Sequence, residues 1–90
     1  MPPVKLFANL RKTAGTKEIS VTGASVGVVV SELVKRYPAL AENLLENGQI
    51  RPHVIITKNG HPTTDMDMPV TEEDEIAIFP PIAGGSGEYS

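Results

Sequence analysis

The first regularity in the chain is an alternation of side chains near its start. Every second residue of segment 4–9 is apolar, namely Val4, Leu6 and Ala8. A period of two is typical of a strand with one buried face, so Phe7 is expected on the face opposite the core. The pattern resumes over residues 18–21, after Gly15 and Thr16. This predicts an antiparallel hairpin whose loop is longer than two residues.

A helical period follows the hairpin. Apolar side chains recur at the spacing of one helix face, namely Val26, Val29, Val30, Leu33, Val34 and Tyr37. Ser25 is placed to cap this helix, and Pro38 is expected to end it because proline disfavours helical geometry in the residue before it. Residues 39–46 are expected to form a short second helix, terminated by Asn47 and Gly48.

The second half of the chain predicts strands joined by turns. Residues 54–57 are expected to form a third strand. Asn59-Gly60 follows it and is a strong two-residue turn signal, so a short pairing segment is expected near His61. The composition of residues 62–69 favours an irregular loop, and that of residues 71–74 favours a polar turn.

The last predicted strand covers residues 75–79. Glu75, Ala77 and Phe79 alternate with Ile76 and Ile78. Phe79 should therefore share the outer face with Phe7 if the two strands are neighbours. Two aromatic side chains on one outer face predict a docking patch.

The elements predict a single domain with a tail. Pro80 and Pro81 prevent the sheet from continuing, and residues 82–90 show no core pattern. We expect a domain of residues 1–79 and a flexible C-terminal tail of residues 80–90. The order of elements predicts an α+β fold, with a mixed sheet of four to five strands packed on one main helix plus a short helix.

Composition narrows the class of protein. The chain has 90 residues, no cysteine and a formal net charge of −3. A chain of this size holds one core and can hardly enclose a deep substrate cavity, so an independent enzyme is not expected. Lack of cysteine excludes thiolate chemistry and, with no signal-peptide pattern, favours a cytoplasmic location. Nucleic-acid binding and membrane insertion are not expected, because the charge is negative and no long apolar run is present.

Two other kinds of site have little support in the sequence. The spacing of His53, His61, Asp65 and Asp67 fits no common set of metal ligands, so no metal site is expected. The acidic residues 72–75 are typical of an exposed turn, which could steer a basic partner, rather than of a catalytic pair in a cleft.

Three segments resemble a known family. Residues 6–11, the Ala14-Gly15 turn and above all residues 74–85 are similar to the small, sulfur-carrying subunit of molybdopterin synthase. The most specific part is the ending Phe-Pro-Pro-Ile-Ala-Gly-Gly of residues 79–85. That subunit belongs to the MoaD/ThiS family of ubiquitin-like sulfur carriers, and the similarity runs from Val4 to Gly85. The thiamin-pathway carriers share the Gly-Gly end but usually lack the Pro-Pro element. The resemblance implies a β-grasp, or ubiquitin-like, fold.

The resemblance also implies a chemistry and partners. In the family, an E1-like adenylyltransferase uses ATP to adenylate the carboxylate of the last glycine, and a sulfur donor converts it into a thiocarboxylate. The tail then enters the large subunit of molybdopterin synthase. Gly85, preceded by Gly84, matches the modified end, and the carrier itself binds no cofactor. Partner contacts are implied for Phe7, Arg11, Phe79, Pro80, Pro81 and Ile82. The alternatives are that Phe7 is packed beneath a helix or loop and that Arg11 is a solvated charge of the hairpin.

The chain departs from the family pattern after Gly85. Residues 86–90 continue the chain, so Gly85 has no free carboxylate and the sequence as written is expected to be inactive as a sulfur acceptor. The leading interpretation is a precursor from which a peptidase removes this extension. The alternatives are a cloning remnant and a non-catalytic binding module. A carrier for another sulfur-transfer pathway or for protein conjugation, in which a lysine amine attacks the activated Gly85, also stays open.

Overall fold

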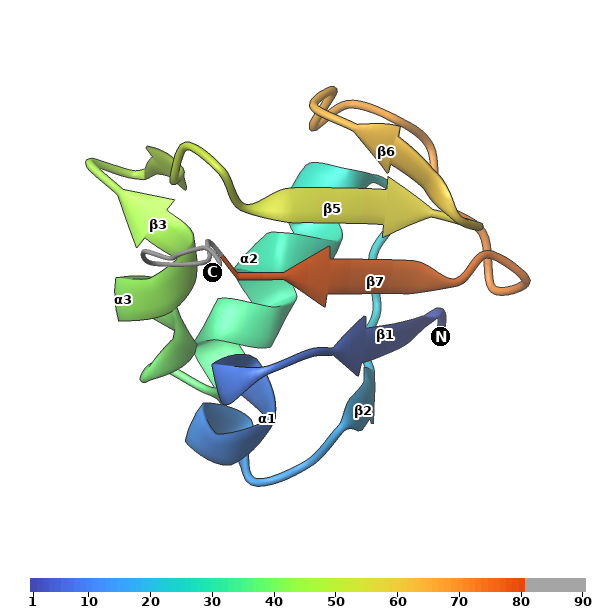
Figure 1. Cartoon of the computed structure of the whole chain (residues 1–90). Helices are drawn as coiled ribbons and strands as arrows, with labels where there is room; N and C mark the ends of the chain where they lie inside the picture. The colour runs from blue at the N-terminus through green and yellow to red at the C-terminus, as the bar shows by residue number, and fades with distance from the viewer. Residues whose placement is uncertain (81–90) are drawn as a thin grey trace.

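The computed structural model describes residues 1–80, which form a five-stranded sheet and three helices (Figure 1). The elements in chain order are β1 (Pro3–Leu6), α1 (Asn9–Ala14), β2 (Glu18–Ser20), α2 (Val26–Arg36), α3 (Leu40–Leu44), β3 (Leu45–Glu46), β4 (Gln49–Ile50), β5 (Ile55–Lys58), β6 (His61–Thr63) and β7 (Ile76–Phe79). β3 and β4 form a separate two-stranded hairpin.

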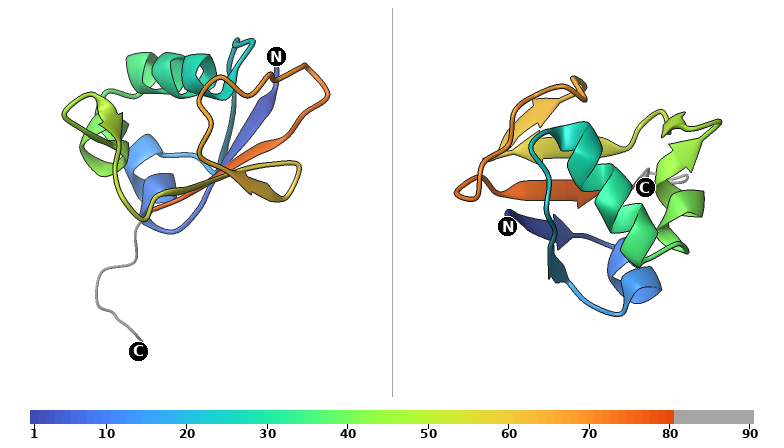
Figure 2. Two further views of the ribbon diagram at one scale, coloured as in Figure 1. Left: turned by 90° about the horizontal axis from the view of Figure 1, so that it is seen from above. Right: turned by 180° about the vertical axis from the view of Figure 1, so that it is seen from behind.

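The sheet is mixed, as the sequence predicted. Its strand order is β2-β1-β7-β5-β6, in which β1 and β7 are parallel and the other neighbours are antiparallel. α2 crosses one face of the sheet and leaves the other face uncovered by helices (Figure 2). The predicted hairpin of the first two strands and the predicted α+β, β-grasp architecture are confirmed.

The core lies between α2 and the inner face of the sheet. Val29 and Leu33 of α2 are fully buried, as are Leu6 of β1 and Ile78 of β7. Burying a side chain of this kind stabilises the fold by about 1.5–3 kcal/mol. The predicted cap is confirmed, because the hydroxyl oxygen of Ser25 accepts a hydrogen bond from the backbone N–H of Val28 at 3.3 Å.

The first predicted loop contains a helix, α1, that the alternation did not reveal. β1 ends at Leu6, and Ala8 is exposed with a φ of 54°, so the expectation of a strand to Asn9 with Ala8 in the core was wrong. The physical reason is Leu10, whose side chain is fully buried when the chain turns into a helix here. Gly15 then ends the helix in the left-handed conformation, with a φ of 78°.

The second helix is shorter than predicted. α3 ends at Leu44, and the next two residues belong to β3. Asn47 and Gly48, with φ values of 54° and 79°, form the turn of the β3–β4 hairpin rather than a helix end. A hairpin turn and a helix C-terminus both need residues that accept positive φ, so Asn-Gly is compatible with either one.

The later strands keep the predicted order with shifted ends. β5 begins at Ile55, β7 begins at Ile76, and β6 includes Pro62, which the sequence had placed in an irregular loop. Proline is tolerated there because β6 is an edge strand, where a missing N–H costs no ladder bond.

A polar corner joins the β5–β6 turn to the start of β7. Asn59 and Gly60 form the predicted turn, with φ values of 51° and 85°. The side-chain amide of Asn59 donates to Asp74 at 2.8 Å, and the backbone N–H of Thr71 donates to the same carboxylate at 2.7 Å. The bond from Thr71 and then that from Asn59 hold the pKa of Asp74 below its usual value. The Asp74 side chain thus holds the acidic turn in place through one bond within the turn and one to the β5–β6 turn.

Replacing Leu10 with alanine tests whether α1 belongs to the core. We expect the free energy of unfolding to fall by about 2–5 kcal/mol, because the substitution leaves a cavity under α1. Urea denaturation measures the change. Val28→Ala, at an exposed position of α2, is the control and should change stability by no more than about 0.5 kcal/mol. Equal, small effects of both substitutions would show that α1 is not packed on the core.

Candidate partner-binding face and C-terminal exit

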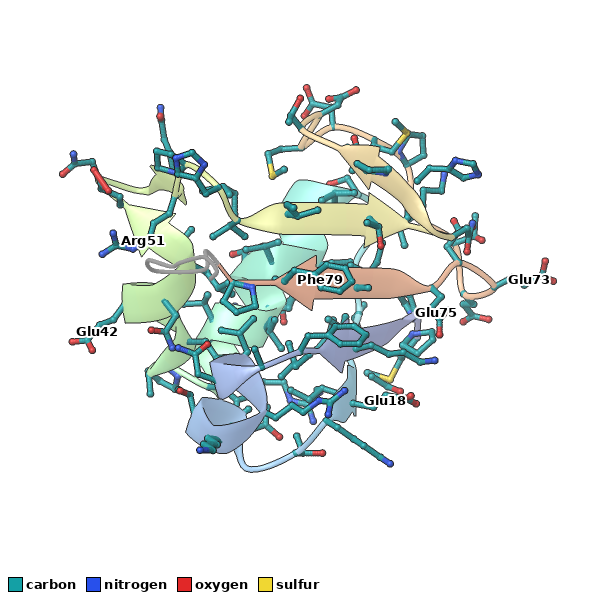
Figure 3. All side chains as sticks on the ribbon, viewed as in Figure 1. Glu18, Glu42, Arg51, Glu73, Glu75 and Phe79 are labelled. Atoms are coloured by element: carbon teal, nitrogen blue, oxygen red, sulfur yellow. The ribbon has the colours of Figure 1, made fainter. Side chains whose placement is uncertain are left out.

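Two aromatic rings meet on the outer face of the sheet. Leu6 of β1 is in register with Ile78 of β7, and both point into the core, so the residue directly after β1 and the last residue of β7 point outward. These residues are Phe7 and Phe79, whose rings stack with centroids 4.4 Å apart and planes 14° from parallel. Figure 3 shows Phe79 on the face turned away from α2. The predicted common face is confirmed.

Arg11 is held against this aromatic pair by α1. Its guanidinium carbon lies 5.2 Å from the ring centroid of Phe7, within the range of a cation–π contact. Its Nε also donates to the carbonyl oxygen of Leu6 at 2.8 Å. Arg11 therefore has a fixed position beside Phe7, unlike a charge on an irregular hairpin loop. Phe7 is half-buried, and its ring contacts Phe79 and the guanidinium of Arg11 from α1.

Ile55 extends the apolar surface to a third strand. It lies directly opposite Phe79 in the antiparallel pair of β5 and β7, so both side chains share the outer face. The residue is 49% exposed. Isoleucine is usually buried, so this position contributes little to the core. We call Phe7, Phe79 and Ile55 the apolar row. Sequence analysis did not identify Ile55, because Val54, Ile55 and Ile56 form a continuous apolar run without alternation.

The outer face changes from apolar to charged along the strands. At the start of β7, the Nζ of Lys5 contacts the Glu75 carboxylate at 2.8 Å. The hydrogen bond to Glu75, reinforced by its charge, raises the pKa of Lys5. The charged groups thus lie near the start of β7, whereas the apolar row lies at its end, where the chain leaves the sheet.

The described chain ends beside a small polar hollow. Pro80 is buried and lines a hollow of about 180 Å³ with Asn9, Glu42, Asn43 and Arg51. Arg51 is anchored there, since its Nε donates to the carbonyl oxygen of Glu42 at 2.9 Å and its guanidinium contacts Glu46 at 3.3 Å. Figure 3 shows Arg51 and Glu42 near α3 and β3. Sequence analysis missed Arg51, because no local pattern marks it.

The structure brings together only some of the predicted site residues. Phe7, Arg11 and Phe79 form one cluster, and Pro80 marks the exit of the chain from it. The other predicted positions, Pro81, Ile82, Gly84 and Gly85 with the extension 86–90, lie outside the described residues.

Residues 1–80 hold neither a cluster of metal-ligating side chains nor a membrane-spanning helix. Over this part of the chain, no three His, Asp or Glu side chains gather so as to hold a metal ion. Nor does this part contain a helix that is both long and apolar enough to span a bilayer.

Comparisons with known proteins agree on one family. The model of the ThiS family matches residues 4–85. The chain is 36% identical over 88 residues to "Small archaeal modifier protein 3" of Haloferax volcanii, covering 91% of this chain and 96% of that protein. It is 34% identical over 85 residues to "Molybdopterin synthase sulfur carrier subunit" of Arabidopsis thaliana, covering 91% and 80% respectively.

A solved structure supports the same assignment. The solution structure of small archaeal modifier protein 1 from Methanosarcina acetivorans is similar to this chain with a TM-score of 0.83 and 35% identity, covering 92% of this chain and 94% of that one. The similarity thus covers nearly the whole length of both chains.

The stacked pair should be coupled but not essential for folding. In a double-mutant cycle with Phe7→Leu and Phe79→Leu, we expect a coupling free energy of about 0.5–1.5 kcal/mol, because leucine keeps apolar area and removes only the ring stacking. Urea denaturation of the four proteins measures it. Phe79→Leu combined with Val28→Ala, on the helix layer, serves as the additive control. A coupling of zero between the two rings would contradict the stacked arrangement.

Proposed function

The chain belongs to the ThiS family of ubiquitin-like sulfur carriers, and from this premise we propose that it carries sulfur as a thiocarboxylate on Gly85. The proposed sequence of events is removal of residues 86–90, activation of the new carboxylate by an E1-like enzyme, and sulfur donation in molybdopterin biosynthesis. One observation carries the proposal: the chain leaves β7 directly beside the stacked rings of Phe7 and Phe79.

Activation requires a free carboxylate on Gly85, and the sequence as written does not provide one. Gly85 is followed by Ser86, so its carbonyl is part of a peptide bond and offers no carboxylate oxygen to ATP. Hydrolysis after Gly85 creates that carboxylate. Its oxygen then attacks the α-phosphate of ATP on the partner enzyme and pyrophosphate leaves. The terminal sulfur of a persulfide donor then attacks the acyl carbon and expels AMP, which leaves an acyl disulfide. A thiol attacks the donor-side sulfur of this S–S bond, so the thiocarboxylate is released and a disulfide forms between the thiol and the donor.

The apolar row has the properties of a docking surface for the enzymes of this route. It presents two aromatic side chains and one exposed isoleucine, with a fixed arginine at its margin, and aromatic and arginine side chains are those that anchor interfaces most often. A partner bound there would lie next to Pro80. From Pro80 to Gly85 an extended chain reaches at most about 20 Å, enough to enter an active site while the domain stays on the partner surface.

The residue types of segment 80–85 suit insertion into the active site of a partner. Gly84 and Gly85 have no Cβ, which lets the chain pass through a narrow channel, and Pro80 and Pro81 restrict the backbone before them. Restricting the unbound chain reduces the conformational entropy lost when it enters the partner.

Protein conjugation is a second candidate, favoured by the similarity to an archaeal modifier protein. Both routes share the activated Gly85 and differ only in the nucleophile, which is sulfur in one and a lysine amine in the other. We give priority to molybdopterin biosynthesis because Phe79-Pro80-Pro81 precedes the Gly-Gly pair and a plant relative is named as a subunit of that synthase.

Intact mass spectrometry of the untagged protein from its own cells tests the proposal. We expect a mass that ends at Gly85, together with a species heavier by about 16 Da, because one oxygen of the carboxylate is replaced by sulfur. Treatment with an alkylating reagent should shift only the heavier species, since a thiocarboxylate is nucleophilic and a carboxylate is not. Recovery of the 90-residue mass alone from cells that make the cofactor would contradict the proposal and favour a binding module.

A further inference from the structure

A second, larger hollow lies on the helix side of the sheet. Within the described part of the chain, α2, the segment from β3 to β5 and the start of the loop after β6 enclose a groove of about 830 Å³. Its floor is mainly apolar and comprises Val30, Val34, Ile50, Val54, Ile56 and Met66. Ile56 belongs to the inner face of the sheet, so the groove faces away from the apolar row. It is not part of the partner-binding face described above.

The charge of the groove is opposite to that of the whole chain. Among its lining residues are Lys35, Arg51 and His53, and none is an aspartate or glutamate, although the chain has a net charge of −3. Lys35 and Arg51 each contact a glutamate outside the lining, Glu32 and Glu46, at 3.3 Å. These ion pairs are exposed, so a second carboxylate can approach at little cost. The groove therefore suits a short segment that has both carboxylates and an apolar side chain.

The groove is connected to the place where the described chain ends. Arg51 lines both this groove and the small hollow that contains Pro80. Ten residues follow Pro80, and an extended chain of that length reaches at most about 33–36 Å. Residues 86–90 contain Glu88 and Tyr89, and no basic side chain. The length of the segment after Pro80, the place where it leaves the fold and its charge are all compatible with binding in the groove.

We propose that the groove between α2 and β5 binds the acidic end of the same chain, residues 86–90. The Glu88 carboxylate faces Lys35 and Arg51, and Tyr89 covers part of the apolar floor. The inference goes beyond the sulfur-carrier function and holds whether or not that function does. It gives the extension a binding site on its own domain as long as it remains attached.

Amide NMR spectra of the full 90-residue protein test this inference, with Glu88→Lys as the first variant. Reversing this charge at the tail cannot disturb the folded core. We expect its largest chemical-shift changes to include amides of the groove, those of Lys35, Ile50, Arg51 and His53, in addition to those of the segment itself. Salt at about 1 M, which shortens the screening length to about 3 Å, should produce similar changes in the unsubstituted protein.

Variants of the groove complete the experiment. Lys35→Glu should abolish most of the difference that Glu88→Lys makes at the groove, whereas Lys17→Glu, the same charge change at an exposed lysine outside the lining, should leave it intact. Changes confined to residues 80–90 on Glu88→Lys would overturn the proposal. So would groove shifts that depend on protein concentration over a twentyfold range, since these would indicate the end of a second copy. Neither outcome bears on the mass of the sulfur-loaded form.

Discussion

The parallel pairing of β1 with β7 is the constraint on which the other features depend. It places the first and last strands side by side in the middle of the sheet, with Leu6 and Ile78 buried in register. The following residues, Phe7 and Phe79, then have to meet on the outer face. Because β7 ends there, the chain leaves the fold beside the ring pair. The packing of Leu6 against the core beside Ile78 thereby fixes both the proposed docking surface and the point where the chain leaves the fold toward Gly85.

The two faces of the sheet differ in surface composition because α2 covers only one of them. The uncovered face presents the apolar row with Arg11 at its margin, and its charged pair, Lys5 and Glu75, lies near the start of β7. The helix side holds the core and, next to it, the cationic groove. Pro80 and Arg51 line the same small hollow, and Arg51 also lines that groove. The two proposals thus assign the C-terminal segment a partner on one side of the sheet and its own domain on the other.

Much of this arrangement could be predicted from sequence, because periodicity reports directly on burial. The alternation around Ile76 and Ile78 placed Phe79 outside, and the helical stripe after Ser25 located α2. Local patterns failed where packing or pairing with another segment decides the structure. α1 forms because Leu10 is buried by residues distant in the chain, and Asn47-Gly48 makes a hairpin turn only because β3 and β4 can pair. Ile55 lies in an apolar run, so its face depends on the register with β7.

ATP–pyrophosphate exchange by the cognate E1-like enzyme tests the central claim most directly, namely that a face beside the exit presents Gly85 for activation. The account predicts rapid exchange with a chain ending at Gly85 and none with the 90-residue chain, because only the former offers a carboxylate at the glycine. Phe79→Leu in the shorter chain should raise the concentration needed for half-maximal exchange without unfolding the domain. Equal exchange with both chain lengths, or none with the shorter one, would contradict the account.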